Sequence, residues 1–192
     1  MKHIIHPNNW RRGRRGHKLE AVVIHIMQGT LAGTTQWFKV SPNHRPPVYA
    51  SSHCGIGKTG EIHDYVSPGD TSYHAGRVNK PIWPNLKRYA WGRAINPNYY
   101  TYGIENEGYR GDRWTEKQMQ AIVSRIKEVL PKPHYTRKHI VSHHEIAADK
   151  ENMTEWCDEI IKRLNGPVDQ PTTTNKVEAI KHLEQALTLL KK

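Results

Sequence analysis

Two short strand-like runs, more than a hundred residues apart, each lead to histidine, and any fold of this chain has to place both ends. The first run is Ala21–His25, AVVIH, which has the composition of a buried strand. The second is Ile140–Val141, which is followed by His143 and His144 and then by a loop rich in oxygen and nitrogen ligands. This layout is typical of a catalytic zinc site, although the second stretch alone fits a solvated surface loop equally well. The rest of the chain is interpreted as the scaffold that brings the two ends together.

The remaining sequence predicts further strands and helices around these runs. Strands are expected over 48–56, 61–66 and 100–105, and helices over 31–40, 115–130 and 154–164. The second of these helices has the clearest pattern, with Thr115 and Gln118 spaced for a capping box. In the first helix, Trp37 and Phe38 are expected to point to the core. Residues 67–99 are rich in Pro, Gly, Asn, Trp and Tyr without a period, which indicates a long functional loop region.

The length of 192 residues predicts one domain of ordinary size with an appendage. The domain is expected over residues 1–165, with a basic arm at 1–19 that is interpreted as either solvated or a contact surface. Residues 166–174, GPVDQPTTT, have the composition of a linker, and 175–192 carry an amphipathic helix pattern. A lone helix of this length is marginal in water. We therefore expect it to dock on its own domain, on a partner or on a second copy, which would give self-association.

The chain is strongly basic, with 29 Lys and Arg against 18 acidic residues and a formal net charge of +11. Such an excess predicts a polyanionic partner, such as nucleic acid, an acidic membrane face or an anionic wall polymer. No helix-turn-helix, zinc-finger or RNP pattern accompanies the charge, so no nucleic acid partner is expected.

The two cysteines, Cys54 and Cys157, do not make a disulfide framework, which indicates synthesis in a reducing compartment. The opening MKHIIHPNNWRRGRRG lacks the continuous apolar core of a signal peptide. No stretch approaches the length of a transmembrane helix. A soluble protein without an export signal is therefore the expectation.

Five motifs follow one another in a familiar order. They are VVIHIMQGT (22–30), SSHCGIGKTGEIHDYV (51–66), YHAG (73–76), YGIENEG (102–108) and VSHHEI (141–146). Together they closely resemble successive motifs of the zinc-dependent, type 2 N-acetylmuramoyl-L-alanine amidases of bacteria and phages, which share a fold with peptidoglycan recognition proteins. The resemblance implies an α/β fold with a mixed central β-sheet flanked by helices and a zinc site in a surface groove. It also implies peptidoglycan as the substrate.

The resemblance gives roles to individual residues. His25 and His143 match two zinc ligands, and Glu105 matches the acidic residue that family members hold near the metal. His53 and His74 match groove positions, which implies contact with the substrate.

The third zinc ligand departs from the family pattern. Family members carry Asp or Cys two residues after a lysine, whereas here Lys150 is followed by Asn152 and the customary Pro-Gly is missing. An amide oxygen is a poorer zinc ligand than a carboxylate, thiolate or imidazole. Asn152 is expected at the position, with Asp149, His144 or Cys157 as alternatives that the sequence does not separate.

The implied activity is zinc-dependent hydrolysis of the amide bond between N-acetylmuramic acid and L-alanine. Zinc with three protein ligands and an open position generates a nucleophile near pH 7 and polarises the carbonyl. Glu105, with Glu107 as the alternative, would carry the proton to the leaving amine, and Lys150 would face the oxyanion. A phage or prophage endolysin, held in the host cytoplasm until it is released to the wall, fits the charge. A non-catalytic peptidoglycan-binding domain with an impaired zinc site is the alternative, because of Asn152.

Overall fold

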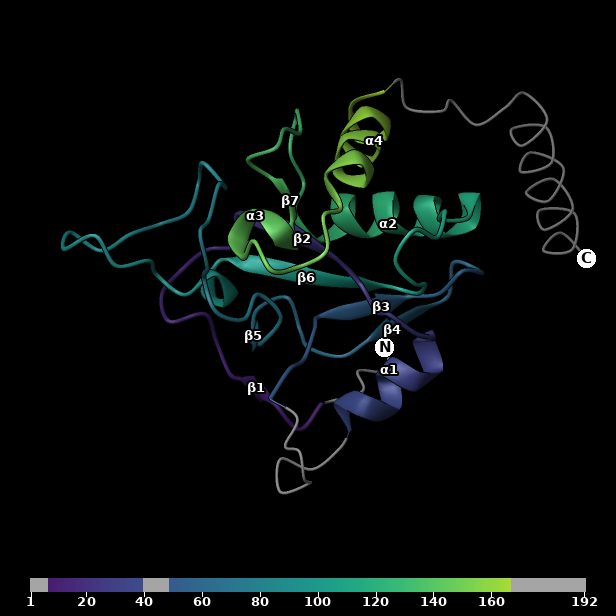
Figure 1. Ribbon diagram of the computed structural model, residues 1–192, viewed down its shortest axis with the longest axis horizontal. Helices are drawn as coiled ribbons and strands as arrows, with labels where there is room; N and C mark the ends of the chain where they lie inside the picture. Colours follow the sequence, from purple (N-terminus) through teal and green to yellow (C-terminus); the bar gives the residue numbers. More distant parts are fainter. Residues whose placement is uncertain (1–6, 40–48, 167–192) are drawn as a thin grey trace, which may run out of the picture.

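The computed structural model describes residues 7–39 and 49–166, which form a mixed β-sheet flanked by helices (Figure 1). The sheet has five strands in the order β4-β3-β6-β2-β7. Their bounds are β2 Ala21–Ile26, β3 Cys54–Ile56, β4 Ile62–Asp64, β6 Thr101–Asn106 and β7 Ile140–Ser142. Strand β2 runs parallel to both β6 and β7, and β3 runs parallel to β6. Among the five strands of this sheet that the structure describes, only the β3–β4 pair is antiparallel. The mixed sheet expected from the resemblance is therefore confirmed.

Two helices cover one face of this sheet. They are α2 Glu116–Val129 and α4 Thr154–Asn165, which lie on the same side of the sheet in Figure 1. Val22 and Ile24 of β2 point into the core that these helices close, while Ala21 and Val23 pack on the opposite face. Because side chains alternate along a strand, His25 belongs to that opposite face.

The other described elements are short and surround the sheet. They are β1 Trp10–Arg11, α1 Leu31–Phe38, β5 Thr71–Ser72, the 3-10 helix η1 Pro97–Tyr99, and α3 His143–Ile146. No described helix is both long enough and apolar enough to cross a bilayer.

Several predicted elements differ in detail from the structure. The strand expected over 48–56 begins only at Cys54, and the one expected over 61–66 is limited to Ile62–Asp64. Phe38 is buried as predicted, but Trp37 is 48% exposed. Thr115 caps α2 by accepting a hydrogen bond from the Gln118 backbone N–H. The reciprocal half of the predicted capping box is wrong, because the Gln118 side chain donates instead to the carbonyls of Ile56 and Glu107.

The basic N-terminal segment is a folded part of the domain from residue 7 onward, and its other basic side chains are exposed or half-buried, so the solvated alternative is wrong for Arg14 alone. Strand β1 pairs with β5, and Arg14 is only 7% exposed. The Arg14 guanidinium donates to the carbonyls of Pro68 at 2.6 Å and Thr101 at 3.0 Å. The expected linker at 166–174, apart from Gly166, and the expected helix at 175–192 lie outside the described residues.

Arg14→Ala should lower the free energy of unfolding by about 2–4 kcal/mol, because it strands buried carbonyls that the guanidinium now satisfies. Urea denaturation followed by circular dichroism measures the change. Arg12→Ala is the matched control, because Arg12 is exposed and its loss removes the same charge. Equal midpoints for the two variants would show that Arg14 does not anchor the segment.

Candidate active site

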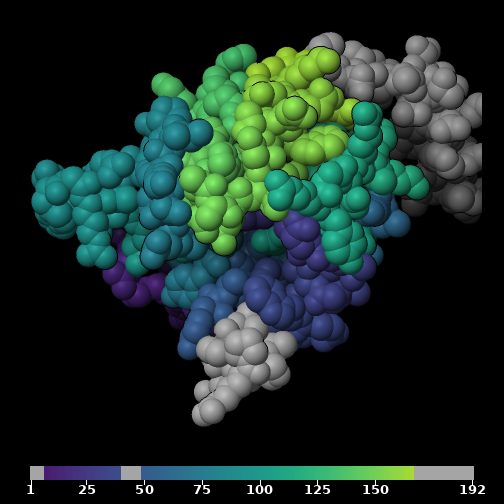
Figure 2. Space-filling model, viewed as in Figure 1, coloured from purple at the N-terminus to yellow at the C-terminus, as the bar shows by residue number. Residues whose placement is uncertain are grey.

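A cavity of about 550 Å³ lies between the ends of the central strands, α1 and the loop that follows α3. We call it the histidine cavity. Figure 2 shows the molecular surface hollowed in this region, between the light-green residues around α3 and the blue residues of α1. The histidine and charged residues in its wall are His25, His74, Glu105, His143, Lys150 and Glu151.

Strand register brings the first two groups together. His25 of β2 and Glu105 of β6 are direct partners in the parallel ladder, and His25 Nδ1 lies 4.0 Å from Glu105 Oε1. His143 arrives from the other neighbour of β2, because α3 begins where β7 ends. The Glu145 carboxylate accepts the Ser142 backbone N–H at 2.7 Å and fixes this turn. The ring centroids of His25 and His143 lie 4.4 Å apart.

Hydrogen bonds determine which nitrogen of His25 is available. Thr101 Oγ1 donates its single proton to the Pro97 carbonyl, so it accepts from His74 Nε2, which lies 3.1 Å away. His74 Nδ1 is then unprotonated and accepts from His25 Nε2 at 3.0 Å. These hydrogen bonds leave the lone pair of His25 on Nδ1, on the side of Glu105. An orienting hydrogen bond on the opposite nitrogen is typical of a metal-binding histidine.

His143 is oriented in the same way by a backbone group. Its Nε2 lies 3.1 Å from the Ala75 carbonyl, which can only accept, so Nε2 carries the proton and Nδ1 carries the lone pair. Burial lowers the pKa of His143 to about 4 and that of His25 well below its usual value. Both rings are therefore neutral near pH 7, which is the form that binds a metal ion.

Glu105 is the carboxyl group of the cavity that is prepared for proton transfer. Burial raises the pKa of Glu105 to about 7. A group with a pKa near the working pH both accepts and releases protons readily, as a general acid–base catalyst requires. Glu107, the alternative, points elsewhere: its Oε2 accepts the Lys58 backbone N–H at 2.9 Å.

Asn152 does not line the histidine cavity, although Lys150, Glu151 and Met153 do. Its Oδ1 accepts the Thr154 backbone N–H at 3.0 Å at the start of α4, and its side chain lines a neighbouring cavity. Direct ligation by Asn152 therefore requires a different arrangement of this loop.

The three alternatives lie outside the cavity wall as well. Asp149 Oδ1 accepts from Asn79 Nδ2, and His144 Nδ1 lies 3.2 Å from the Lys150 carbonyl. Cys157 is buried in the core under α4, where burial raises its pKa to about 12. Within residues 7–39 and 49–166, no three His, Cys, Asp or Glu side chains are grouped to hold a metal. The structure thus shows two well-oriented donors, and it leaves the third open.

The two groove histidines have structural positions. His53 is fully buried, with Nδ1 accepting the Gly103 backbone N–H at 3.0 Å and Nε2 lying 3.2 Å from the Asp70 carbonyl. Direct contact between His53 and a substrate is therefore wrong for this structure. His74 borders the cavity, and both its ring nitrogens are used, one of them in the hydrogen bond to His25, so its contact with a substrate stays a prediction. Sequence reasoning missed Thr101 and the Ala75 carbonyl, because nothing in a sequence distinguishes one threonine or one backbone carbonyl from the others.

Comparisons with known proteins agree with this arrangement. Residues 15–158 match the family described as N-acetylmuramoyl-L-alanine amidase, Amidase_2. Over 116 residues the chain is 30% identical to N-acetylmuramoyl-L-alanine amidase A of Achromobacter lyticus. This match covers 59% of the chain and 52% of that protein. The chain therefore spans about half the length of this curated relative.

Two solved structures share the fold at low sequence identity. The crystal structure of an Se-Met AmpD derivative has a TM-score of 0.63 at 20% identity, over 86% of this chain and 94% of that one. The amidase AmiD from E. coli, in complex with the substrate anhydro-N-acetylmuramic acid-L-Ala-D-gamma-Glu-L-Lys, has a TM-score of 0.54 at 17% identity. That match covers 78% of this chain and 58% of AmiD.

Proposed function

Because this chain belongs to the N-acetylmuramoyl-L-alanine amidase family, we propose that it hydrolyses the amide bond between N-acetylmuramic acid and L-alanine in peptidoglycan. The observation that carries this proposal is the pair of neutral histidines whose Nδ1 lone pairs are free, beside a carboxyl group with a pKa near 7. Histidines that serve only in packing would not each need an orienting hydrogen bond on one ring nitrogen and a titrating carboxyl group beside them.

We propose zinc as the cofactor, held by His25 and His143 through Nδ1. Imidazole nitrogen is a preferred zinc donor, and the opposite nitrogen of each ring already makes the hydrogen bond that such a ligand needs. When bound, zinc supplies Lewis acidity toward the carbonyl and toward water.

The chain's own groups carry the proton and the charge. Glu105 accepts a proton from the attacking water and then donates it to the departing amine of L-alanine. Lys150, in the wall of the same cavity, places a positive charge beside the oxyanion that develops from the carbonyl. His74 and Thr101 hold the His25 ring so that the cavity is organised before the substrate arrives.

The test is to incubate the protein with a soluble muropeptide that carries N-acetylmuramic acid and an L-Ala stem, with zinc or with a chelator. We expect a free N-terminal L-alanine and a free lactyl carboxylate, identified by mass spectrometry, only with zinc. Binding of the muropeptide without any cleavage would favour the second candidate function, a peptidoglycan-binding domain. The observation that favours this second candidate is that the described residues show no third zinc ligand grouped with the two histidines.

For the third metal donor, Glu151 is the residue to test. It lines the histidine cavity and offers a carboxylate, which now pairs with Arg110 at 3.3 Å. We expect Glu151→Gln to weaken zinc retention about tenfold or more in a chelator competition, because removal of an anionic donor weakens the site. Asn152→Asp should leave zinc retention within about twofold, because the Asn152 Oδ1 accepts the Thr154 backbone N–H and does not line the histidine cavity. The reverse order would return the third position to Asn152.

We also propose an endolysin role, in which the protein stays in the host cytoplasm until it is released to the wall. The net charge of +11 supports attraction to anionic wall polymers. Expression inside a bacterium, with and without a pore-forming protein in the inner membrane, tests this role. Lysis only in the presence of the pore is the expected result, and intact cells in both cultures would contradict it.

A further inference from the structure

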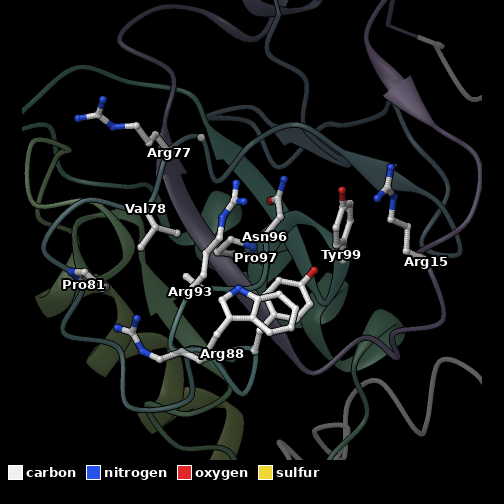
Figure 3. Close-up of a pocket in the computed structure, with 13 residues that line it drawn as sticks. Arg15, Arg77, Val78, Pro81, Arg88, Arg93, Asn96, Pro97 and Tyr99 are labelled. Atoms are coloured by element: carbon white, nitrogen blue, oxygen red, sulfur yellow. The ribbon is translucent and has the colours of Figure 1, made fainter.

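A second, larger cavity lies next to the histidine cavity and is lined by arginine. It has a volume of about 820 Å³, and its charged lining residues are Arg15, Arg77, Arg88 and Arg93. We call it the arginine cavity. In Figure 3, Arg77 and Arg88 lie on one side, Arg15 lies on the other, and Arg93 stands between them. No described carboxylate lines it, so the positive charge is not neutralised within the wall.

We propose that the arginine cavity binds an acidic glycan, whose sugar rings stack on Tyr89 and Trp91 and whose phosphate or carboxylate groups pair with the arginines. The site is separate from the histidine cavity. Guanidinium groups bind phosphate and carboxylate by paired hydrogen bonds, and they do so better than lysine.

The aromatic part is a pair of stacked rings on a tight turn. Arg88 and Ala94 form an antiparallel bridge, and the Tyr89 backbone N–H donates to the Arg93 carbonyl at 2.9 Å. Between them, the rings of Tyr89 and Trp91 stack at 4.6 Å with an interplanar angle of 2°. Trp91 is nevertheless 74% exposed, and Tyr89 is 40% exposed. Large flat rings left in water beside cations are typical of a surface that binds a ring-shaped ligand.

The turn is held by a firm base, although it projects from the domain at the left of Figure 1. Trp83 is buried, and its ring stacks on Tyr100 with centroids 5.8 Å apart. The backbone N–H groups of Ile82 and Trp83 both donate to the Glu145 carbonyl of α3. The aromatic pair therefore stands on an anchored loop, and little order has to be gained when a ligand binds.

Arg15 is brought to the cavity by a different segment. Its neighbour Arg14 is buried and bonded to the carbonyls of Pro68 and Thr101, so the chain at this point cannot swing away. Arg15 itself has φ +49°, a left-handed conformation that is costly for a residue with a side chain. Its guanidinium lies 5.2 Å from the centre of the Tyr99 ring, which also lines the cavity. Strain that is retained in order to present one side chain is typical of a functional position.

The arginine cavity adjoins the histidine cavity. Gly76 lines both, and the residue before it supplies the carbonyl that orients His143. A polymer held in the first cavity would therefore be kept next to the second. Stacked rings and arginines would also suit a single-stranded nucleic acid. The choice of a glycan rests on the proposed function, because peptidoglycan stands among acidic glycans in a cell wall.

The experiment measures binding of the full chain by titration calorimetry to four polymers. They are phosphomannan, polygalacturonate, uncharged dextran and single-stranded poly-uridine. We expect binding to one or both acidic glycans, with an affinity that falls as salt rises, and no binding to dextran. The comparison between phosphomannan and polygalacturonate identifies which anion the arginines take.

Variants then locate the binding in this cavity. Arg93→Ala and Arg88→Ala should each weaken glycan binding about tenfold, and Trp91→Ala about fivefold or more. The matched controls are Arg12→Ala and Tyr109→Ala, which remove an exposed arginine and an exposed aromatic ring outside the cavity. All three side chains to be removed are exposed, so the fold should be retained, which circular dichroism checks.

Hydrolysis of a soluble muropeptide by the same variants separates this inference from the proposed function. Unchanged kcat/KM together with lost glycan binding supports the inference. The inference is overturned if the wild-type protein binds neither acidic glycan. It is also overturned if the control variants lose as much glycan affinity as the cavity variants, or if poly-uridine binds more tightly than the acidic glycans. A raised KM for the muropeptide with unchanged glycan binding would assign the cavity to the stem peptide instead. If neither the wild-type protein nor any variant hydrolyses the muropeptide, the proposed function fails while the glycan-binding result still stands.

Discussion

Glu105→Gln should lower the rate of muropeptide hydrolysis by about 10²–10⁴-fold while zinc remains bound. Glutamine keeps the size and the position of the side chain, but it cannot take a proton from water. The loss should appear in kcat more than in KM, because the group acts on the reacting atoms rather than on the distant parts of the substrate. Steady-state kinetics and metal analysis of the same preparation measure both results.

Glu107→Gln is the matched control for this substitution. It removes a carboxylate from the same stretch of chain, two residues away, but Glu107 is bonded to the Lys58 backbone and lies outside the histidine cavity. Its rate should stay within about twofold of wild type. If Glu105→Gln loses zinc as well as activity, Glu105 is a metal ligand and the proton carrier must be sought elsewhere.

The pH profile gives an independent check on Glu105. A general base works when it is deprotonated, so the rate should rise with pH through the pKa of this group, which burial raises to about 7. A cation held at the two histidines would favour the carboxylate and shift this rise to lower pH. Glu105→Gln should remove the rise at the acidic side of the profile. A profile unchanged by the substitution would assign it to another group.

His25→Ala and His143→Ala should each abolish zinc binding and muropeptide hydrolysis. Each substitution removes one of the two oriented Nδ1 donors, and a single imidazole retains zinc poorly at micromolar concentrations. Metal content after gel filtration should fall from about one zinc per chain to a background value. Added zinc should raise the melting temperature of wild type and leave both variants unchanged, because a ligand stabilises only the state that binds it.

His144→Ala is the control for the two ligand substitutions. His144 follows His143 directly, yet it does not line the histidine cavity, and its Nδ1 lies beside the Lys150 carbonyl. This variant should keep its zinc and most of its activity. Zinc that is retained by His143→Ala but lost by His144→Ala would exchange the roles of the two neighbours and show that the loop is arranged differently when metal is bound.

The scaffold of the site was largely predictable from sequence, because strands impose strict geometry. Once Ala21–His25 and Ile140–Val141 are assigned as neighbouring strands, the ends that carry His25 and His143 must meet. The pairing of His25 with Glu105 follows from parallel register in the same way. Helix α2 was predictable from its apolar stripe and from Thr115, which caps it.

The parts that sequence missed depend on side-chain direction within loops. His53 and His74 belong to motifs of the same kind as His25, but burial turns both into internal hydrogen-bonding groups. Position alone suggested Asn152 as a ligand, whereas the start of α4 uses its oxygen to satisfy a free backbone N–H. Arg14 looked like one of several surface cations, and only its contacts with three-dimensional neighbours separate it from Arg12.

The reacting groups and the arginines stand on parts of the chain that can change at different rates in evolution. His25 and Glu105 are fixed by backbone pairing at the centre of the sheet, where an insertion or deletion of one residue would turn a side chain to the opposite face. Arg88, Arg93 and Trp91 stand on an exposed turn that is closed by the Arg88–Ala94 bridge and belongs to no strand of the central sheet, so its tip can lengthen, shorten or change composition without moving those strands. If the turn binds the proposed glycan, descendants of this protein could adapt to a different cell surface by altering the turn alone, and the proposed bond-cleaving groups would be inherited unchanged.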